Sequence, residues 1–416
     1  MNFYVSFFGC RTNQAEIQEW IIELENHGYR LTDDISEAEF GILNTCSVTE
    51  KAENDVFRFL RKSYKKSNIP WIVAGCTVSG SNDLLEKRYS NYTFLNNIQK
   101  KKIVDIIREK FPFNNNVIFH SSFRSRFFLK VQDGCNFNCS FCIVPSLRGK
   151  SESMLLEELQ KRAKYSSSLG YREVILTGIN LSSYGYDLFP RRNILELARV
   201  LSEIKDIEII RLSSLDPRFI DYKFIKELSK IKKIAHSFHF SFQSGNDSIL
   251  KSMKRNSRVK DYKKILGDFY SFFPKANYGA DFIIGFPGEG DKEYLDTFDF
   301  IKKSNLSYIH AFPFSQRPRT KAVDMEPVLS KIVRRRVFEF RELNKEKKLR
   351  YREKFRGEIL EGILIEENEN YSLVTTKNYI TVRVPPVKGF KKKLVKVVIL
   401  KIVNENLCEG KIADSL

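Results

Sequence analysis

Short apolar runs alternate with amphipathic stretches along the first part of the chain. The runs have the length of β-strands and cover residues 3–8, 40–43, 71–74 and 92–95. The stretches between them repeat their apolar side chains at helical spacing and cover residues 13–27, 48–66 and 98–110. Strands that alternate with helices predict a parallel sheet with helices on its faces. We expect an N-terminal α/β domain over residues 1–118, with an Asn-rich linker at 113–122.

The same alternation continues over residues 124–350, where we expect a second domain. Strand-like runs cover residues 127–131, 173–176, 207–212, 237–242, 278–284 and 307–312. Helical patterns such as 154–169 and 194–204 lie between them. Repeated strand–helix units of this number favour a partly or fully closed (β/α) barrel over a small open sheet.

The pattern changes again over residues 355–416, which carry β-rich runs broken by charged turns. These runs cover residues 359–365, 371–376, 380–384 and 395–403. They predict a small antiparallel β-barrel, close to the lower size limit of an independent domain.

Composition excludes several classes of protein. The chain has 416 residues, of which 42% are hydrophobic, and this content excludes wholesale disorder. No apolar run approaches the ~20 residues of a membrane span. Residues 1–9 carry no charged segment ahead of an apolar stretch, so we expect no signal peptide. Seven cysteines in so long a chain do not suggest a secreted disulfide framework, which favours a cytoplasmic protein with reduced thiols.

Positive charge is in excess, with 70 Lys and Arg against 51 Asp and Glu. A Lys-rich genome would produce such an excess without any functional meaning. The cations are clustered, however: residues 331–356, which read as one long helix, hold twelve Lys or Arg and four Glu. A second basic cluster lies within residues 251–264. Clusters of this kind favour a polyanionic partner, most commonly a nucleic acid.

Cys135, Cys139 and Cys142 follow directly after the first strand of the predicted barrel. A structural zinc site needs four ligands, and a disulfide would leave one of the three thiols unpaired. An iron–sulfur cluster with three cysteine-bound irons and one open iron fits this spacing best. Its place at a strand end, on the rim of a barrel, is where active sites are built.

Cys10, Cys46 and Cys76 each come immediately after an apolar strand of the N-terminal domain. The carboxyl ends of parallel strands meet at one edge of a sheet, so these thiols can converge although about thirty residues separate them. Any one of them alone would be read as a small buried side chain. Three at equivalent positions predict a second cluster with an open iron. Cys408 remains, and we expect it to pack in the C-terminal barrel.

The run Cys135–Cys142, with Phe141 before its last cysteine, resembles the signature of the radical S-adenosylmethionine superfamily. The resemblance implies a 4Fe–4S cluster at Cys135, Cys139 and Cys142 whose open iron binds S-adenosylmethionine. In that superfamily, reductive cleavage of the sulfonium gives a 5′-deoxyadenosyl radical, which abstracts hydrogen from an unactivated C–H bond.

The whole chain resembles the methylthiotransferases of this superfamily. Residues 9–14 (Gly-Cys-Arg-Thr-Asn-Gln) and 44–46 (Asn-Thr-Cys) match that family's N-terminal motifs, and the terminal barrel resembles an RNA-binding TRAM domain. The resemblance implies two 4Fe–4S clusters, of which the one at Cys10, Cys46 and Cys76 handles the sulfur. One S-adenosylmethionine would supply the methyl group and another the radical.

Three branches of the family differ in substrate. MiaB-like members modify isopentenyladenosine in tRNA, MtaB-like members modify N6-threonylcarbamoyladenosine in tRNA, and RimO-like members modify an aspartate of a ribosomal protein. Residues 177–180 (Thr-Gly-Ile-Asn), 183–185 (Ser-Tyr-Gly) and 211–217 (Arg-Leu-Ser-Ser-Leu-Asp-Pro) resemble the MtaB branch. We therefore expect methylthiolation of C2 of threonylcarbamoyladenosine next to the anticodon, with the MiaB-like and RimO-like activities as alternatives.

Residues at other strand ends are candidates for binding the cofactor, with a turn, a cap or a structural salt bridge as the alternative in each case. They are Gly178, Arg211, Ser213, Gln243 and Asp281. Gly178 lacks a Cβ, so a ligand can approach its backbone closely, and the resemblance places it near the amino group of S-adenosylmethionine. Asp281 is a polar residue in an apolar strand and needs a partner.

Three further observations concern the surroundings of the barrel. Arg148 follows the cysteine loop and could meet a carboxylate or a phosphate. Glu152 and Met154 stand where the family usually has further arginines; if those arginines hold substrate or RNA in relatives, that contact is altered here. The five histidines include no pair at metal-ligand spacing, although His310 ends a strand and could face the barrel.

The implied partners are a tRNA anticodon stem-loop, a flavodoxin- or ferredoxin-like electron donor and a sulfur donor that the sequence does not identify. No membrane partner is expected. Two rival hypotheses are a protein-modifying enzyme of the same family and a non-catalytic RNA-binding or iron-sensing protein that has kept both cluster sites.

Overall fold

The computed structural model describes residues 1–66, 69–113, 117–119 and 123–413, and it divides into two compact units. The first unit comprises residues 1–123, 133–151 and 315–323, and the second comprises residues 124–132, 152–314 and 324–416. The loop that carries Cys135, Cys139 and Cys142 thus groups with the N-terminal sheet. The predicted domain boundaries stay predictions, and the predicted linker at 113–122 lies partly outside the described residues.

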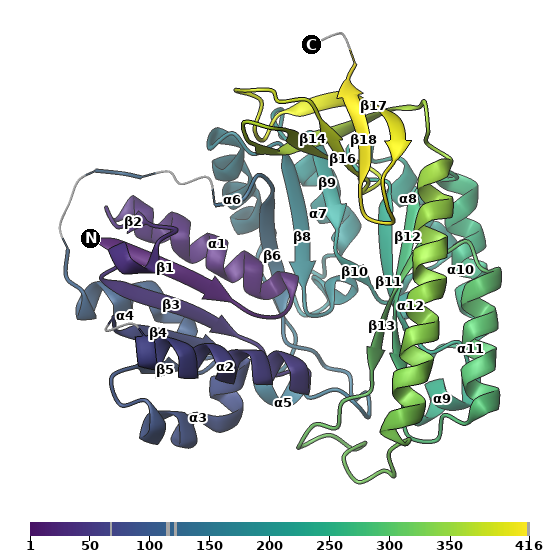
Figure 1. The fold of residues 1–416 in the computed structure, drawn as a ribbon, viewed down its shortest axis with the longest axis horizontal. Coiled ribbons are helices and arrows are strands. Elements are labelled where there is room, and N and C mark those ends of the chain that lie inside the picture. Colours follow the sequence, from purple (N-terminus) through teal and green to yellow (C-terminus); the bar gives the residue numbers. More distant parts are fainter. Residues whose placement is uncertain (67–68, 114–116, 120–122, 414–416) are drawn as a thin grey trace. The chain divides into compact units, whose positions relative to one another are not determined.

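A five-stranded parallel sheet forms the centre of the first unit, in the order β2-β1-β3-β4-β5 (Figure 1). The strands are β1 (Asn2–Phe7), β2 (Arg30–Leu31), β3 (Phe40–Thr45), β4 (Trp71–Gly75) and β5 (Thr93–Leu95). The helices are α1 (Arg11–Asn26), α2 (Glu50–Lys66), α3 (Cys76–Arg88), α4 (Ile103–Lys110) and α5 (Val144–Arg148), with 3₁₀ turns η1 (Ile35–Glu37) and η2 (Gln99–Lys102). The predicted strands and helices of this region are all present.

Helices cover both faces of this sheet because its strands are apolar on both sides. Ile42 belongs to the core formed with α1 and α4, whereas its neighbour Leu43 belongs to the core formed with α2 and α3. Successive side chains on a strand point to opposite faces, so a continuous apolar run requires cover on both. The strand order reverses between β1 and β3, which makes the carboxyl edge of these strands a topological switch point.

The second unit holds two open four-stranded sheets, in the orders β7-β6-β8-β9 and β10-β11-β12-β13. The strands are β6 (Phe127–Asp133), β7 (Glu152–Ser153), β8 (Glu173–Gly178), β9 (Ile209–Leu212), β10 (Ser214–Leu215), β11 (Ser237–Gln243), β12 (Asn277–Ile284) and β13 (Tyr308–Pro313). The six strands predicted from the sequence are present, and they form an open arrangement that corresponds to a partial barrel.

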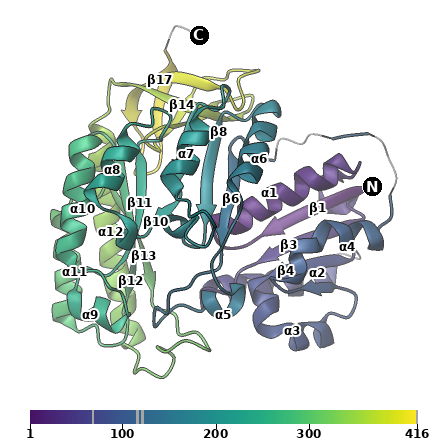
Figure 2. The ribbon, with the colours of Figure 1, turned by 180° about the vertical axis from the view of Figure 1, so that it is seen from behind.

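Helices line one face of these strands, as Figure 2 shows for α8, α10 and α11. They are α6 (Leu156–Ser168), α7 (Ile194–Ser202), α8 (Tyr222–Ser229), α9 (Asp247–Ser252), α10 (Val259–Phe272), α11 (Asp291–Lys303) and α12 (Ser330–Glu353), with 3₁₀ turns η3 (Leu181–Ser183) and η4 (Pro217–Phe219). On β11, Phe238 and Phe240 pack against Phe269 of α10. The alternate residues of β11, His239 and Ser241, therefore face away from the helices.

The C-terminal segment closes into a five-stranded barrel in the order β14-β15-β16-β18-β17. Its strands are β14 (Ile359–Glu367), β15 (Ser372–Thr376), β16 (Thr381–Val384), β17 (Leu394–Ile402) and β18 (Cys408–Ile412). We predicted an antiparallel barrel. Strands β16 and β18 pair in parallel, so one pairing of the barrel departs from that prediction. Cys408 is fully buried in the barrel core, the packing position expected of it. Within the described ranges, every helix is too short or too polar to cross a bilayer.

Replacing Gly41 with Ala should destabilise the N-terminal sheet. A Cβ on Gly41 would lie 2.7 Å from the Trp71 ring, which is itself fully buried. Overpacking of this kind costs about 1–3 kcal/mol. The matched control is Gly267→Ala in α10, where a Cβ meets nothing within 4 Å. Thermal unfolding of the cluster-free protein should show a lower Tm for the first variant and an equal or higher Tm for the second. Equal shifts would contradict the packing described here.

Candidate active site

Cys10, Cys46 and Cys76 lie at the carboxyl ends of three neighbouring strands, β1, β3 and β4. The loops touch one another: a Cβ on Gly9 would lie 2.6 Å from the Cys46 sulfur, so only glycine fits between β1 and Cys46. Cys10 is the N-cap of α1 and Cys76 is the first residue of α3. Both thiols therefore lie at the start of a helix that follows a strand of the parallel sheet.

Cys46 differs from Cys10 in its surroundings. Cys46 is buried whereas Cys10 is exposed. Burial raises the pKa of the Cys46 thiol to about 12, and the neighbouring Cys10 and Cys76 raise it further, against a smaller lowering by Arg148. A metal ligand must be a thiolate, so loading of this site requires Cys46 to lose a proton.

The loop that carries Cys135, Cys139 and Cys142 closes tightly on itself. The Cys135 amide donates to the Gly149 carbonyl at 3.1 Å, and the Cys142 amide donates to the Cys139 carbonyl at the same distance. A Cβ on Gly134 would lie 2.0 Å from the Lys150 carbonyl oxygen, so the two ends of the loop require glycine there.

Arg148 ties this loop to the sheet edge that carries Cys10 and Cys76. Its side chain is 2% exposed, and Nη1 lies 2.9 Å from Asp133 Oδ1 and 3.2 Å from Glu16 Oε1. Its Nη2 donates to Asn13 Oδ1 at 2.7 Å. Burial lowers the pKa of Arg148, but the negative charges of Glu16, Cys76, Asp133 and Cys10 outweigh it and raise the pKa above its ordinary value. The carboxylate contact predicted for Arg148 is confirmed.

Two further contacts bring the cysteine sets together within the first unit. Asn97 Nδ2 lies 3.7 Å from the Cys76 sulfur and donates to the Leu147 carbonyl at 2.8 Å. Cys76 also packs against Ile143 and Leu147, which follow Cys142 in the chain.

The segment 315–323 reaches both cysteine stretches. Arg317 Nη2 donates to Ser47 Oγ at 2.9 Å and pairs with Glu53 at 2.7 Å. The Ala322 amide donates to the carbonyl of Ser140, which follows Cys139, at 2.8 Å. The residues beside Cys46 and beside Cys139 are therefore held by the same nine-residue segment.

The donor atoms fit inorganic clusters better than single ions. Among the described residues, no three cysteines have sulfur atoms that all lie within 4.8 Å of one another. Thiolates on one ion lie closer than this, whereas a cluster places each thiolate on a different iron. The nearby Arg148 guanidinium would offset part of the negative charge of the thiolates.

The cofactor-binding candidates of the second unit differ in whether their polar groups are already bonded within the protein. Gly178 ends β8, and its missing Cβ would lie 3.0 Å from the Gln132 carbonyl. The Ser213 hydroxyl is buried and has no hydrogen-bond partner among the described residues. Gln243 ends β11 with a φ of 73°, in the left-handed region that is strained for glutamine. A buried free hydroxyl and a strained strand end are compatible with ligand binding, which stays a prediction for all three.

Arg211 differs from the other candidates, because its guanidinium is already hydrogen-bonded to residues of the protein. Its Nε lies 2.6 Å from Glu173 Oε1, and its two Nη atoms donate to the carbonyls of Lys377 and Thr376. The guanidinium also stacks over the Tyr379 ring at 4.7 Å. These contacts join β9 to the C-terminal barrel and favour a structural role over the predicted contact with the cofactor.

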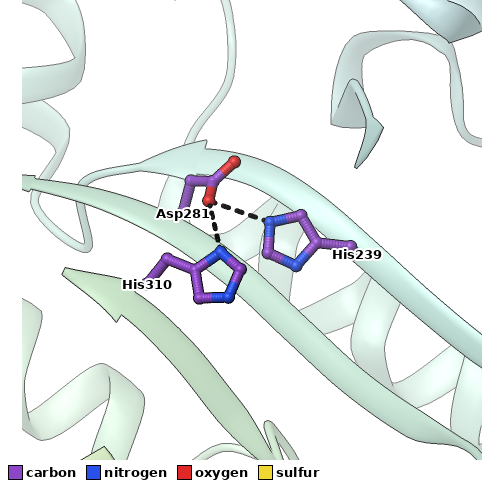
Figure 3. A group of neighbouring side chains, drawn as sticks. All are labelled: His239, Asp281 and His310. Carbon is purple, nitrogen blue, oxygen red and sulfur yellow. Dashed lines mark hydrogen bonds and ion pairs between the residues drawn. The ribbon is translucent and has the colours of Figure 1, made fainter. Parts of the chain in front are cut away.

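Asp281 lies with two histidines that the sequence analysis did not connect with it, as Figure 3 shows. Its Oδ1 is 2.9 Å from His239 Nε2 and 3.2 Å from His310 Nδ1. Burial alone would raise the pKa of Asp281, but the two histidines outweigh burial and hold the pKa below its usual range. The predicted need of Asp281 for a partner is confirmed. We expected no pair of histidines placed to bind a metal. This expectation is wrong, because His239 and His310 are far apart in the sequence but lie close together in the fold.

Comparison with known proteins agrees with this arrangement. Residues 129–301 match the radical SAM superfamily, and residues 2–95 match the uncharacterized protein family UPF0004. A radical S-adenosylmethionine methyltransferase, TsrM from Kitasatospora setae, has a similar fold, with a TM-score of 0.56 and 11% identity over 77% of this chain and 76% of its own. The fold and the cysteine loop thus define a radical SAM enzyme, which implies an iron–sulfur cluster and S-adenosylmethionine.

Comparison with curated relatives shows to which family of radical SAM enzymes the chain belongs. The threonylcarbamoyladenosine tRNA methylthiotransferase MtaB of Aquifex aeolicus is 33% identical over 94% of this chain and 98% of its own length. The MtaB protein of Rickettsia prowazekii is 32% identical over 90% of each chain. The chain belongs to the radical S-adenosylmethionine methylthiotransferases and is most like their MtaB branch.

Alkylation of the cluster-free, reduced protein should follow the burial of the thiols. At neutral pH, Cys10 should react readily with iodoacetamide. Cys46 should react far more slowly, because its pKa of about 12 leaves little thiolate. The rate at Cys46 should rise about tenfold per pH unit below that pKa. Peptide mass spectrometry would measure the rates, with buried Cys408, whose pKa is raised to about 11, as an internal reference. Equal rates at Cys10 and Cys46 would contradict this geometry.

Replacing Arg148 with Met should destabilise the cluster-free protein by about 3–5 kcal/mol, because buried carboxylates would lose their cation. The matched control is Arg162→Met, which removes a one-third exposed arginine paired with Glu158. That change should cost no more than about 1 kcal/mol. Urea unfolding measures both variants. An Arg148 variant as stable as the control would refute the role of this network.

Proposed function

We propose that this enzyme methylthiolates C2 of N6-threonylcarbamoyladenosine next to the anticodon of tRNA. The names of the similar MtaB proteins support the substrate. The convergence of both cysteine sets in one compact unit supports the reaction, and this observation carries the proposal. Methylthiolation needs a radical source and a sulfur-presenting centre close to each other. The tRNA substrate also favours a cytoplasmic enzyme.

The two cysteine sets have different roles in this proposal. Cys135, Cys139 and Cys142 hold one 4Fe–4S cluster, and Cys10, Cys46 and Cys76 hold the other. When bound, these groups and S-adenosylmethionine supply the radical and the sulfur group for the reaction. Arg148 holds the ligand loop against the sheet edge, and burial of Cys46 keeps water from the inner side of the second site.

The remaining candidate residues orient the cofactor. Gly178 would present its backbone to the cofactor at the end of β8, and the Ser213 hydroxyl is available as a hydrogen-bond donor. Gln243 presents its side chain from the end of β11. Asp281 is left out of this set, because its carboxylate is paired with His239 and His310.

Helix α12 offers the surface that would bind the RNA phosphates. Its exposed cations are Lys331, Arg334, Arg335, Arg341, Lys345 and Arg350, and the exposed Lys354 caps its C-terminus. Arg336 does not belong to this set, since it is buried against Glu289 at 2.9 Å. In the second basic cluster, Arg255 is likewise buried and donates to the Ser241 carbonyl. The TRAM-like barrel would add to this surface.

The proposal predicts a separation of two activities. Protein reconstituted with iron and sulfide, and given dithionite and S-adenosylmethionine, should form 5′-deoxyadenosine and convert threonylcarbamoyladenosine in tRNA to its 2-methylthio derivative. Cys139→Ala should lose both products. Cys46→Ala should keep cofactor cleavage and lose methylthiolation. Cys408→Ala is the matched control, because it removes a buried cysteine of the C-terminal barrel, and it should keep both activities.

The molecule that accepts the methylthio group distinguishes the MtaB-like, MiaB-like and RimO-like branches of the family. Nucleoside mass spectrometry should find the product with tRNA that carries threonylcarbamoyladenosine. Product on isopentenyladenosine would favour a MiaB-like enzyme, and labelled methyl in ribosomal protein would favour a RimO-like enzyme. Absence of 5′-deoxyadenosine from the loaded protein would favour a non-catalytic RNA-binding or iron-sensing role. The identities of the electron donor, which we expect to be flavodoxin- or ferredoxin-like, and of the sulfur donor are separate questions.

A further inference from the structure

His239, Asp281 and His310 stand on three adjacent parallel strands, β11, β12 and β13 (Figure 3). The pairing register fixes their neighbourhood: Asp281 lies opposite His310, and His239 lies opposite Gly279, two residues before Asp281 on β12. Their strand neighbours Phe238, Ala280 and Ile309 are buried. The three polar side chains therefore share the face of the sheet that is turned away from the helices.

The ligand atoms of this trio lie at the separations found around one cation. Both imidazoles approach the same carboxylate oxygen, Asp281 Oδ1, at 2.9 Å and 3.2 Å. All three ligand atoms lie within 4.8 Å of one another. Metal–ligand bonds of about 2.0–2.2 Å place neighbouring ligand atoms roughly 3 Å apart. Two imidazole nitrogens and a carboxylate oxygen form a ligand set suited to a divalent transition metal.

The surroundings orient the first histidine as a ligand. His239 Nδ1 lies 3.0 Å from Tyr308 Oη, which leaves Nε2 for the shared centre. Tyr308 holds this position because its ring occupies the space of a missing side chain: a Cβ on Gly279 would lie 2.0 Å from the ring. A hydrogen-bond partner on the second ring nitrogen fixes the tautomer of a metal-bound histidine.

The trio is also accessible from one side. The His310 side chain is 50% exposed, whereas the His239 side chain is 11% exposed. Three protein ligands leave further positions of a metal free, and the exposed side is where a small oxygen donor can bind.

We propose that His239, Asp281 and His310 bind one divalent transition-metal ion, with open coordination positions for an oxygen ligand. The site is distinct from both cysteine sets in its residues and in its harder nitrogen and oxygen donors. It does not depend on the identity of the nucleoside substrate, so its failure and the failure of the proposed function are separable.

Cobalt tests the proposal, because it is distinguished from cluster iron by elemental analysis. Holoenzyme with both clusters loaded is dialysed against Co²⁺, and bound cobalt and iron are measured together. We expect one bound Co²⁺ per chain. His310→Ala should abolish it, and Tyr308→Phe should weaken the affinity about 10–100-fold through the lost hydrogen bond to His239. Iron content and Tm report whether each variant is folded and loaded.

His236→Ala is the matched control, since it removes an exposed histidine that lies immediately before β11 and three residues before His239. It should bind Co²⁺ as the unaltered holoenzyme does. His310→Gln provides a second variant that keeps the size and polarity of the side chain and removes the imidazole. No bound Co²⁺ in the unaltered holoenzyme, or equal binding by His310→Gln and His236→Ala, would overturn the proposal.

Discussion

The arrangement of the cysteine sites depends on one buried cation. A guanidinium removed from water needs acceptors for its protons, and Arg148 finds them in Asp133, Glu16 and Asn13. These residues come from the end of β6 and from α1, so a single side chain fixes the ligand loop against the helix that follows Cys10. Lys100 pairs with the same Glu16 at 2.8 Å and adds a second buried cation. The two buried cations are therefore balanced by the carboxylates of Glu16 and Asp133 in one network.

The protein uses two kinds of donor set in two compact units. Thiols gather in the first unit, at the ends of three parallel strands and close to the buried guanidinium of Arg148. Imidazole and carboxylate gather on the strands of the second unit, where Tyr308 and Gly279 set the orientation of His239. Soft sulfur donors and harder nitrogen and oxygen donors thus lie in different compact units.

Sequence reasoning succeeded where the signal was local. Apolar runs with helical or strand-like spacing located the longer strands of the three sheets that precede the barrel, and the position of Cys10, Cys46 and Cys76 after strands predicted their common edge. Strand β18 was missed, because its sequence Cys-Glu-Gly-Lys-Ile holds little apolar signal. Gly410 belongs there for a reason visible only in three dimensions: a Cβ would lie 2.1 Å from the Val398 carbonyl. The contacts of Arg211 and the His239–His310 pair also depend on register between distant strands, which periodicity does not encode.

The segment 315–323 has a consequence for the order of events during synthesis. Its Arg317 and Ala322 hold the residues next to Cys46 and Cys139, so the first compact unit is completed by a piece of chain that leaves the ribosome late. Until then the nascent N-terminal sheet lacks part of its cover beside the thiols. The thiols therefore have their greatest exposure in that interval, before residues 315–323 pack beside them.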